Sequence, residues 1–150
     1  MDIDIDNARM LIETGMPHAR ELGVRLVDIE ESGIVLRLDY QDRLVGDPGN
    51  GVLHGGNLTV LLDTACGLST YTRMQTISPL ATLDLRIDYL RPARRGEAVH
   101  AAAECYRVTR HVAFCRGVAY HQDREDPIAH CTGTFMLGTK GQPPVGGLKT

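Results

Sequence analysis

The sequence lacks a hydrophobic run long enough to cross a bilayer, which takes roughly 18 to 20 residues. Its 150 residues are 43% hydrophobic and 23% charged, as in ordinary globular domains. The first ten residues, MDIDIDNARM, are acidic and lack the basic start and apolar stretch of a secretory signal. These absences argue against a membrane-spanning protein and predict a cytoplasmic one.

Cysteine is scarce, and positive charge is not in excess. The four cysteines include no C-x-x-C pair, which argues against a zinc site and against a disulfide framework. We therefore expect buried free thiols and no metal. A net charge of -3 disfavours nucleic-acid binding, which needs a basic face. The cysteines are Cys66, Cys105, Cys115 and Cys131.

Internal repeats and low-complexity linkers are also missing, so the chain is predicted to form one domain, 1–150. Asp6 before an apolar run predicts a helix over 6–15 that ends near Gly15 and Pro17, within an N-terminal helix and loop over 1–20. The many Gly and Pro residues predict an irregular loop over 41–53 and a flexible tail over 139–150.

Two hydrophobic periods predict one long helix and a set of strands. From Gly55 to Arg73 the apolar residues follow the period of a helix and cover most of its circumference, which predicts a central, buried helix. Six other segments alternate, and small residues on their faces let a sheet close around a helix. We predict an α+β fold with the helix wrapped by about five or six antiparallel strands. The strand segments are 23–30, 33–40 (after a hairpin turn at 31–33), 81–90, 98–108, 112–121 and 128–137, and in 81–90 the alternation places Leu83, Leu85, Ile87 and Tyr89 on one face.

A single carboxylate, Asp63, lies in the predicted central helix. It is the only charged residue between Pro48 and Thr72, histidine apart. Because an unpaired buried charge is costly, Asp63 is either satisfied by a neighbouring strand or subunit or is functional, as a general base or a nucleophile. Gly67, one turn later on the same stripe, is expected to leave open space beside the carboxylate.

His54-Gly55-Gly56 comes where the helix begins. The first amides of a helix lack internal partners, and glycines let another molecule approach them closely, which together describe an oxyanion hole. The glycines are also consistent with a tight loop-to-helix turn. His54 fits a capping or supporting residue better than a general base.

The string H-G-G followed by L-L-D-T-A and C-G-L-S resembles the signature of hotdog-fold acyl-CoA thioesterases, in particular the PaaI-like branch of the phenylacetate pathway. TLDLRIDYLRPARRGE and RVTRHVAFCRGVAY are similar to later segments of that family, and the resemblance extends over roughly 20–138. It implies a hotdog fold, with a long helix in a curled antiparallel sheet. It also implies homodimers that join two sheets edge to edge, or homotetramers.

The resemblance also implies residue roles. Gly55 would present its backbone N–H to the thioester carbonyl, with Gly56 supporting the turn, and Asp63 would be the catalytic carboxylate, supplied by the opposite subunit. Thr82 would orient the attacking water, although it also fits an ordinary strand residue. Many relatives carry Asn six residues before the histidine, where this chain has Pro48, and Asn50 is a candidate replacement.

The substrate implied is an acyl-CoA, hydrolysed to a free acid and CoA with no other cofactor. Leu68 and Tyr71 are candidate acyl-pocket residues, and the arginine clusters are candidate contacts to the CoA phosphates, although solvated arginines in turns are common. The alternatives are a non-catalytic acyl-CoA-binding hotdog protein, a hydratase or dehydratase on the same fold, and a structural dimerisation domain. The basic candidates are Arg91, Arg94 and Arg95 in one cluster and Arg107, Arg110 and His111 in the other.

Overall fold

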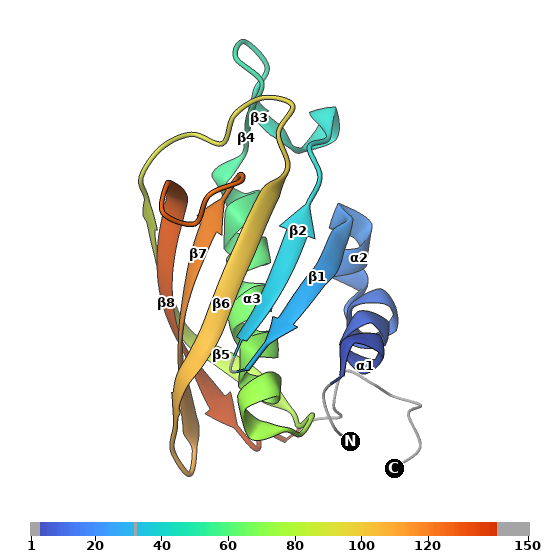
Figure 1. Cartoon of the computed structure of the whole chain (residues 1–150), viewed down its shortest axis with the longest axis vertical. Coiled ribbons are helices and arrows are strands. Elements are labelled where there is room, and N and C mark those ends of the chain that lie inside the picture. The colour runs from blue at the N-terminus through green and yellow to red at the C-terminus, as the bar shows by residue number, and fades with distance from the viewer. Residues whose placement is uncertain (1–3, 32, 141–150) are drawn as a thin grey trace.

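The computed structural model describes residues 4–31 and 33–140 and has one long helix, α3 (Gly55–Met74), held in a curled sheet (Figure 1). The predicted α+β class and central helix are confirmed. The other helical elements are α1 (Ile5–Met10), a π-helical turn (Leu11–Gly15), α2 (Pro17–Leu22) and a 3-10 turn (Asp42–Leu44). The strands are β1 (Val24–Glu30), β2 (Gly33–Leu38), β3 (Val45–Asp47), β4 (Val52–Leu53), β5 (Leu80–Tyr89), β6 (Val99–Val108), β7 (Val112–Tyr120) and β8 (Pro127–Leu137).

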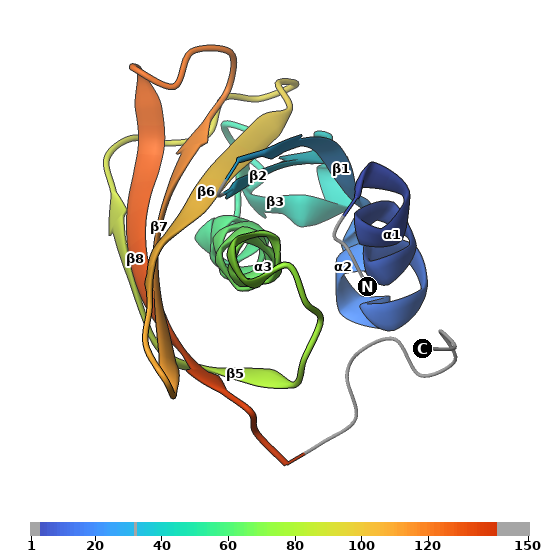
Figure 2. The same ribbon diagram turned by 60° about the horizontal axis from the view of Figure 1, so that its bottom comes forward.

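Six strands form one antiparallel sheet in the order β1-β2-β6-β7-β8-β5, and β3 and β4 form a separate hairpin. The sheet curves around α3, while α1 and α2 lie beside the β1 end (Figure 2). β1 and β5 are therefore the two edges. Between α2 and β5 one side of α3 is left without a covering strand.

Small side chains let the middle strands approach α3 closely. The alanine and cysteine side chains of β6 and β7 that point toward the helix are all buried in the core around it. The four cysteines are free and buried, as predicted. The small residues facing the helix are Ala101, Ala103, Cys105, Ala113, Cys115 and Ala119.

The N-terminal helix differs from the prediction. Asp4, not Asp6, caps α1, because its side chain accepts a hydrogen bond from the Asn7 amide at 2.8 Å. The helical segment formed by α1 and the π-helical turn ends at Gly15, as predicted, and Pro17 occupies the first turn of the next helix, α2, where its missing N–H costs nothing. Gly23, with a φ of 83°, then ends α2 in the left-handed conformation that glycine adopts readily.

A β-bulge changes the expected alternation in β5. The register with β8 shifts between Thr82 and Asp84, so Leu83 is an extra residue, and it is 51% exposed rather than on the inner face. Leu85 and Ile87 do pack against the core. Tyr89, at the end of the strand, is 53% exposed.

Four smaller expectations were also wrong or lie wholly or partly outside the described residues. Gly67 leaves no open space, since a Cβ there would lie 3.6 Å from Phe135 and 3.8 Å from Leu80. The loop over 41–53 contains the β3–β4 hairpin. Ser32 of the predicted hairpin turn and most of the predicted tail, 141–150, lie outside the described residues.

No helix of the described chain combines the length and the apolar character needed to span a membrane.

Candidate active site

The first half of α3 exposes a narrow stripe of side chains. The stripe repeats every four residues, as one face of a helix does, and its members are all half-buried, whereas every residue from 65 to 72 is buried. Asp63 therefore lies on the open side of a helix that was predicted to be central and buried. The stripe consists of Gly55, Gly56, Thr59, Val60, Asp63 and Thr64.

The Asp63 carboxylate borders a hollow of about 420 Å³ between α2, α3 and β5. Thr82 on β5 donates its hydroxyl to Asp63 Oδ1 at 2.9 Å. Burial raises the pKa of Asp63, and the hydrogen bond from Thr82 acts in the opposite direction. A carboxylate with a raised pKa accepts protons more readily than an ordinary one, as a general base must. The hollow is lined by Met16, His18, Ala19, Thr59, Val60, Asp63, Thr64, Thr82 and Leu85.

At the start of α3, His54 is the N-cap. Its Nδ1 accepts a hydrogen bond from the Gly56 N–H at 2.9 Å, and a Cβ on Gly56 would lie equally close to this nitrogen, at 2.9 Å. Among the described residues, the Gly55 N–H has no hydrogen-bond acceptor. The helix start thus keeps one amide free, at the end where the helix dipole favours negative charge.

Tyr89 is a site residue that the sequence did not single out. Its hydroxyl donates to the Gly55 carbonyl oxygen at 3.1 Å and lies 2.7 Å from Thr59 Oγ1. The ring also lies over Gly55, because a Cβ there would be 3.3 Å from Tyr89 Cε1. The only signal in the sequence was a tyrosine at the end of the strand that follows the helix, and periodicity alone could not pair it with Gly55.

Gly55 and Asp63 are eight residues apart on one straight element. At 1.5 Å per residue, their separation along the helix axis is about 12 Å. A donor to a carbonyl oxygen and a base beside the same carbonyl must both lie within about 3 Å of the reacting group. One chain therefore cannot place its Gly55 amide and its own Asp63 on a single thioester.

The two predicted arginine clusters lie at opposite ends of the molecule. The segment of Arg91, Arg94 and Arg95 is at the end where α3 begins, and the β6–β7 turn with Arg107, Arg110 and His111 is at the end where α3 finishes (Figure 1). The structure does not bring the two clusters together within one chain.

Two arginines of the first cluster, Arg91 and Arg94, already have polar partners in the protein. Arg91 donates to the Asp126 carbonyl oxygen at 2.7 Å and to its carboxylate at 3.1 Å, and Arg94 pairs with Glu97 at 2.8 Å. The Arg95 side chain lies against Gly51, where an added Cβ would meet it at 2.5 Å. Any phosphate contact by Arg91 or Arg94 would compete with these pairs.

The predicted acyl-pocket residues and Asn50 lie away from the Asp63 hollow. Leu68 and Tyr71 are 2% and 3% exposed and belong to the core, where burial raises the pKa of Tyr71 to about 12. Asn50 lies in the β3–β4 hairpin, and its side chain accepts a hydrogen bond from the Val52 amide at 3.0 Å, which closes the turn.

The described residues contain no group of three or more His, Cys, Asp or Glu side chains placed to hold a metal ion.

Comparison with known proteins identifies the family. The family model of the thioesterase superfamily matches residues 50–128, which is more than half of the chain. The chain belongs to the thioesterase superfamily. This membership, with the relatives described next, confirms the PaaI-like hotdog family, the hotdog fold and the enzyme class predicted from the sequence, a thioester hydrolase.

Relatives of this superfamily member include a named acyl-CoA thioesterase and solved structures. The medium/long-chain acyl-CoA thioesterase YigI of Escherichia coli strain K12 is 38% identical over 136 residues, which cover 82% of this chain and 86% of YigI. A crystal structure from Pseudomonas aeruginosa is 44% identical with a TM-score of 0.79, over 88% of this chain and 97% of that one. The phenylacetic acid degradation protein PaaI of Thermus thermophilus, solved as a mutant, is 28% identical with a TM-score of 0.70, over 81% and 98%.

Proposed function

We propose that this protein hydrolyses acyl-CoA thioesters to a free acid and CoA, with medium or long acyl chains as the preferred class. The observation that carries the proposal is the half-buried Asp63, with a raised pKa and a hydroxyl partner, in an open hollow of a thioesterase-superfamily fold. The similarity to YigI supports the acyl-CoA substrate and the chain-length class.

In this proposal the free Gly55 N–H donates a hydrogen bond to the thioester carbonyl oxygen and stabilises the negative charge that develops there. Asp63 either removes a proton from the attacking water or attacks the carbonyl carbon itself, and Thr82 orients the carboxylate or the water. In the first route the water oxygen adds to the carbonyl carbon, the carbon–sulfur bond breaks, and the proton taken by Asp63 passes to the leaving CoA thiolate. In the second route the carbon–sulfur bond breaks as an anhydride forms on Asp63, CoA leaves as a thiolate that takes a proton from solvent, and water then hydrolyses the anhydride to the free acid. The cytoplasmic location inferred from the sequence remains a prediction.

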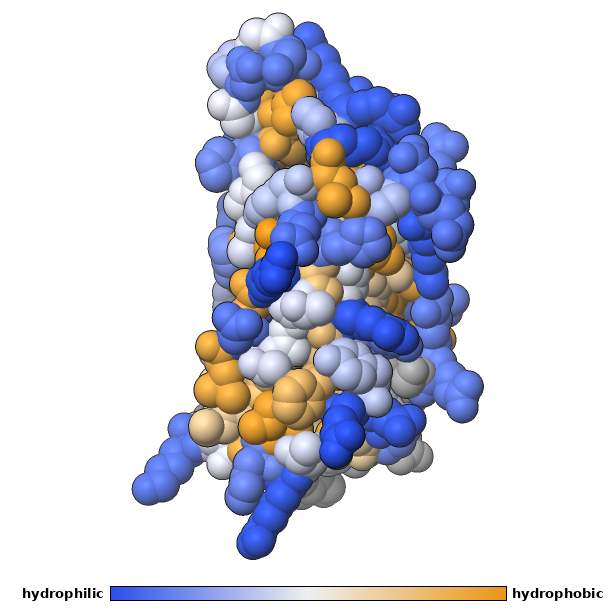
Figure 3. Space-filling model, turned by 90° about the vertical axis from the view of Figure 1, so that its left-hand side faces the viewer, coloured by the Kyte–Doolittle hydropathy of each residue, from blue (hydrophilic) through white to orange (hydrophobic). Residues whose placement is uncertain are grey.

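The catalytic unit proposed is a homodimer, alone or within a dimer of dimers. Gly55 and Asp63 of one chain are about 12 Å apart, so each complete site needs Asp63 of one subunit and Gly55 of the other. β5 is an unpaired edge that leaves Leu83, Tyr89 and Leu90 about half exposed, and a second sheet edge could cover it. Hydrophobic side chains also gather toward the lower end of the side that carries β5 and β8 (Figure 3).

The first test is thiol release from a panel of acyl-CoA substrates by the purified protein and by Asp63→Asn. We expect turnover of at least one medium- or long-chain substrate and a loss of about 100-fold or more in the variant, because the general base or nucleophile is gone. Asp84→Asn is the matched control, since Asp84 is an exposed carboxylate on the same strand as Thr82. Unchanged turnover in Asp63→Asn would exclude this mechanism, and tight binding without any thiol release would favour a non-catalytic acyl-CoA-binding protein.

Gly55→Pro tests the amide donor separately. Proline removes the N–H but is tolerated in the first turn of a helix, and His54 already has the extended backbone (φ -60°, ψ 132°) that residues before proline adopt. We expect a loss of about 100- to 1,000-fold. Gly55→Ala keeps the N–H and adds the same Cβ beside Tyr89, so it controls for that contact.

Mixing the two inactive variants tests the shared site. If each site combines two subunits, a hybrid of Asp63→Asn and Gly55→Pro chains contains one doubly altered site and one intact site. Random subunit exchange should then restore about a quarter of the wild-type activity per chain. No recovery, with hybrids demonstrated by mass spectrometry, would contradict the shared geometry.

A further inference from the structure

The N-terminal helix α2 forms one wall of the Asp63 hollow, a role that no sequence pattern indicated. Met16, just before α2, and His18 and Ala19 of α2 line the hollow together with Asp63, as does Leu85 of β5. The apolar part of this lining comes from Met16, Ala19, Val60 and Leu85. Neither Leu68 nor Tyr71, the residues predicted for the acyl pocket, contributes to it.

A second hollow, of about 390 Å³, follows the same side of α3 toward its first turn. It ends at His54 and Gly56, about 10 Å along the helix axis from Asp63. Its apolar lining continues that of the first hollow, because Leu22 extends the α2 wall and Leu44 and Val45 form the far side. The full lining is His18, Leu22, Arg43, Leu44, Val45, His54, Gly56, Asn57 and Val60.

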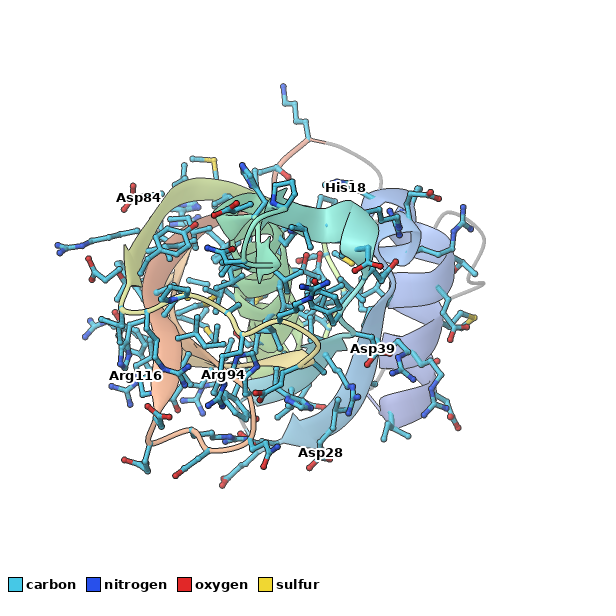
Figure 4. The ribbon with its side chains drawn as sticks, turned by 90° about the horizontal axis from the view of Figure 1, so that it is seen from above. His18, Asp28, Asp39, Asp84, Arg94 and Arg116 are labelled. Carbon is cyan, nitrogen blue, oxygen red and sulfur yellow. The ribbon has the colours of Figure 1, made fainter. Side chains whose placement is uncertain are left out.

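His18 stands where the two hollows meet. The two hollows share only two lining residues, Val60 on the floor and His18 on the α2 wall. Seen from above, His18 lies at the rim between α2 and the segment that leads into β3 (Figure 4). Its side chain is exposed, and within the described part of the chain it makes no hydrogen bond or ion pair. The imidazole of His18 therefore borders both hollows, and no hydrogen bond or ion pair with another described residue holds its orientation.

We propose that α2 is the acyl-chain wall of the site and that His18 sets the length of the chain accepted. This inference rests on the proposed acyl-CoA hydrolysis. A short acyl group fills the hollow beside Asp63, and a longer chain must pass His18 to reach the hollow lined by Leu22, Leu44 and Val45. Burial of each further methylene in the second hollow then favours longer substrates by about fourfold.

The test compares kcat/KM across a saturated series from butanoyl-CoA to palmitoyl-CoA for the wild type, His18→Ala and His18→Trp. We expect His18→Ala to raise the ratio of palmitoyl to butanoyl turnover at least about tenfold, since the passage widens. His18→Trp should lower that ratio. Arg20→Ala is the matched control, because Arg20 is also exposed on α2 but borders a different hollow, beside β1.

Binding measurements separate this inference from the proposed function. In an Asp63→Asn background, calorimetry should show the same shift in relative affinity for palmitoyl-CoA and butanoyl-CoA when His18 is replaced. Wild-type turnover with unchanged chain-length profiles and unchanged relative affinities in both His18 variants would overturn the role of α2 while leaving acyl-CoA hydrolysis intact. Shifted affinities without any wild-type thiol release would keep the groove and refute the hydrolase. Circular dichroism and thermal melts exclude misfolding, which is not expected at an exposed side chain without partners.

Discussion

The two halves of α3 belong to one helix but face different surroundings. Residues 55–64 include a half-buried stripe with glycines, threonines and a carboxylate, and residues 65–72 are buried on every side, against β6, β7 and Phe135 among others. The polar side chains of the second half bond within the core, as Ser69 and Thr70 do with the Cys66 carbonyl oxygen at 2.7 and 3.3 Å. The comparison shows that the second half fixes the helix in the sheet, whereas the first half leaves Asp63 beside an open hollow and, among the described residues, the Gly55 N–H without an acceptor.

The largest expected effect is a loss of stability when a side chain in the buried half of α3 is truncated. Leu68→Ala removes a 2% exposed core residue and should lower the free energy of unfolding by about 2 to 5 kcal/mol, measured by urea denaturation. At low temperature the folded variant should keep its relative turnover of short and long acyl-CoA substrates. Altered chain-length preference without a loss of stability would instead return Leu68 to the acyl pocket.

A smaller effect is expected where the open half meets β5. Thr82→Val removes the hydroxyl that donates to Asp63 and that lowers its pKa, so the pKa of Asp63 should rise further. Because the ionised carboxylate is the active form, the acidic limb of the kcat/KM profile should move to higher pH, and activity on that limb should fall by about tenfold.

Thr82→Ser keeps a hydroxyl and is the control for this shift. Its pH profile should coincide with that of the wild type. A profile that does not move in Thr82→Val would mean that the hydrogen bond between Thr82 and Asp63 has no part in catalysis.

The smallest effect should come from Tyr89→Phe. The ring stays over Gly55, but the hydroxyl contacts to the Gly55 carbonyl oxygen and to Thr59 are lost. As a positioning residue, Tyr89 should affect kcat by about fivefold and leave KM nearly unchanged, in keeping with one neutral hydrogen bond. Tyr106→Phe, at another exposed strand tyrosine, should change neither constant, and a change in KM alone for Tyr89→Phe would indicate substrate contact instead.

Much of the fold could be predicted because periodicity reports burial directly. The predicted helix, Gly55 to Arg73, ends one residue before the observed α3, and the six predicted strand segments correspond to the six strands of the main sheet. The bulge at Leu83 could not be predicted, since a bulge inserts a residue without altering the alternation around it. The capping role of Asp4 was missed because Asp4 and Asp6 are both acidic residues that could begin the same helix.

The candidate site was predictable where a residue is unusual for its element, and not where only tertiary packing brings residues together. Asp63 and Gly55 stand out as a lone charge in an apolar helix and a glycine at its start. Tyr89 and His18 are ordinary residues in their own segments, and each acquires a position in the site only because β5 and α2 pack along α3. For the same reason the sequence could not show that Leu68 and Tyr71 lie in the core, outside the lining of the Asp63 hollow.

If the proposed shared site is correct, the eight-residue spacing between the Gly55 amide and the Asp63 carboxylate makes turnover depend on protein concentration. Each polypeptide would hold one half of two different reaction centres, so a lone copy would contain every required residue and complete neither centre. Dilution below the dissociation constant of the proposed homodimer should therefore abolish turnover without unfolding the chain. The specific activity of the protein would then depend on its concentration in the cell.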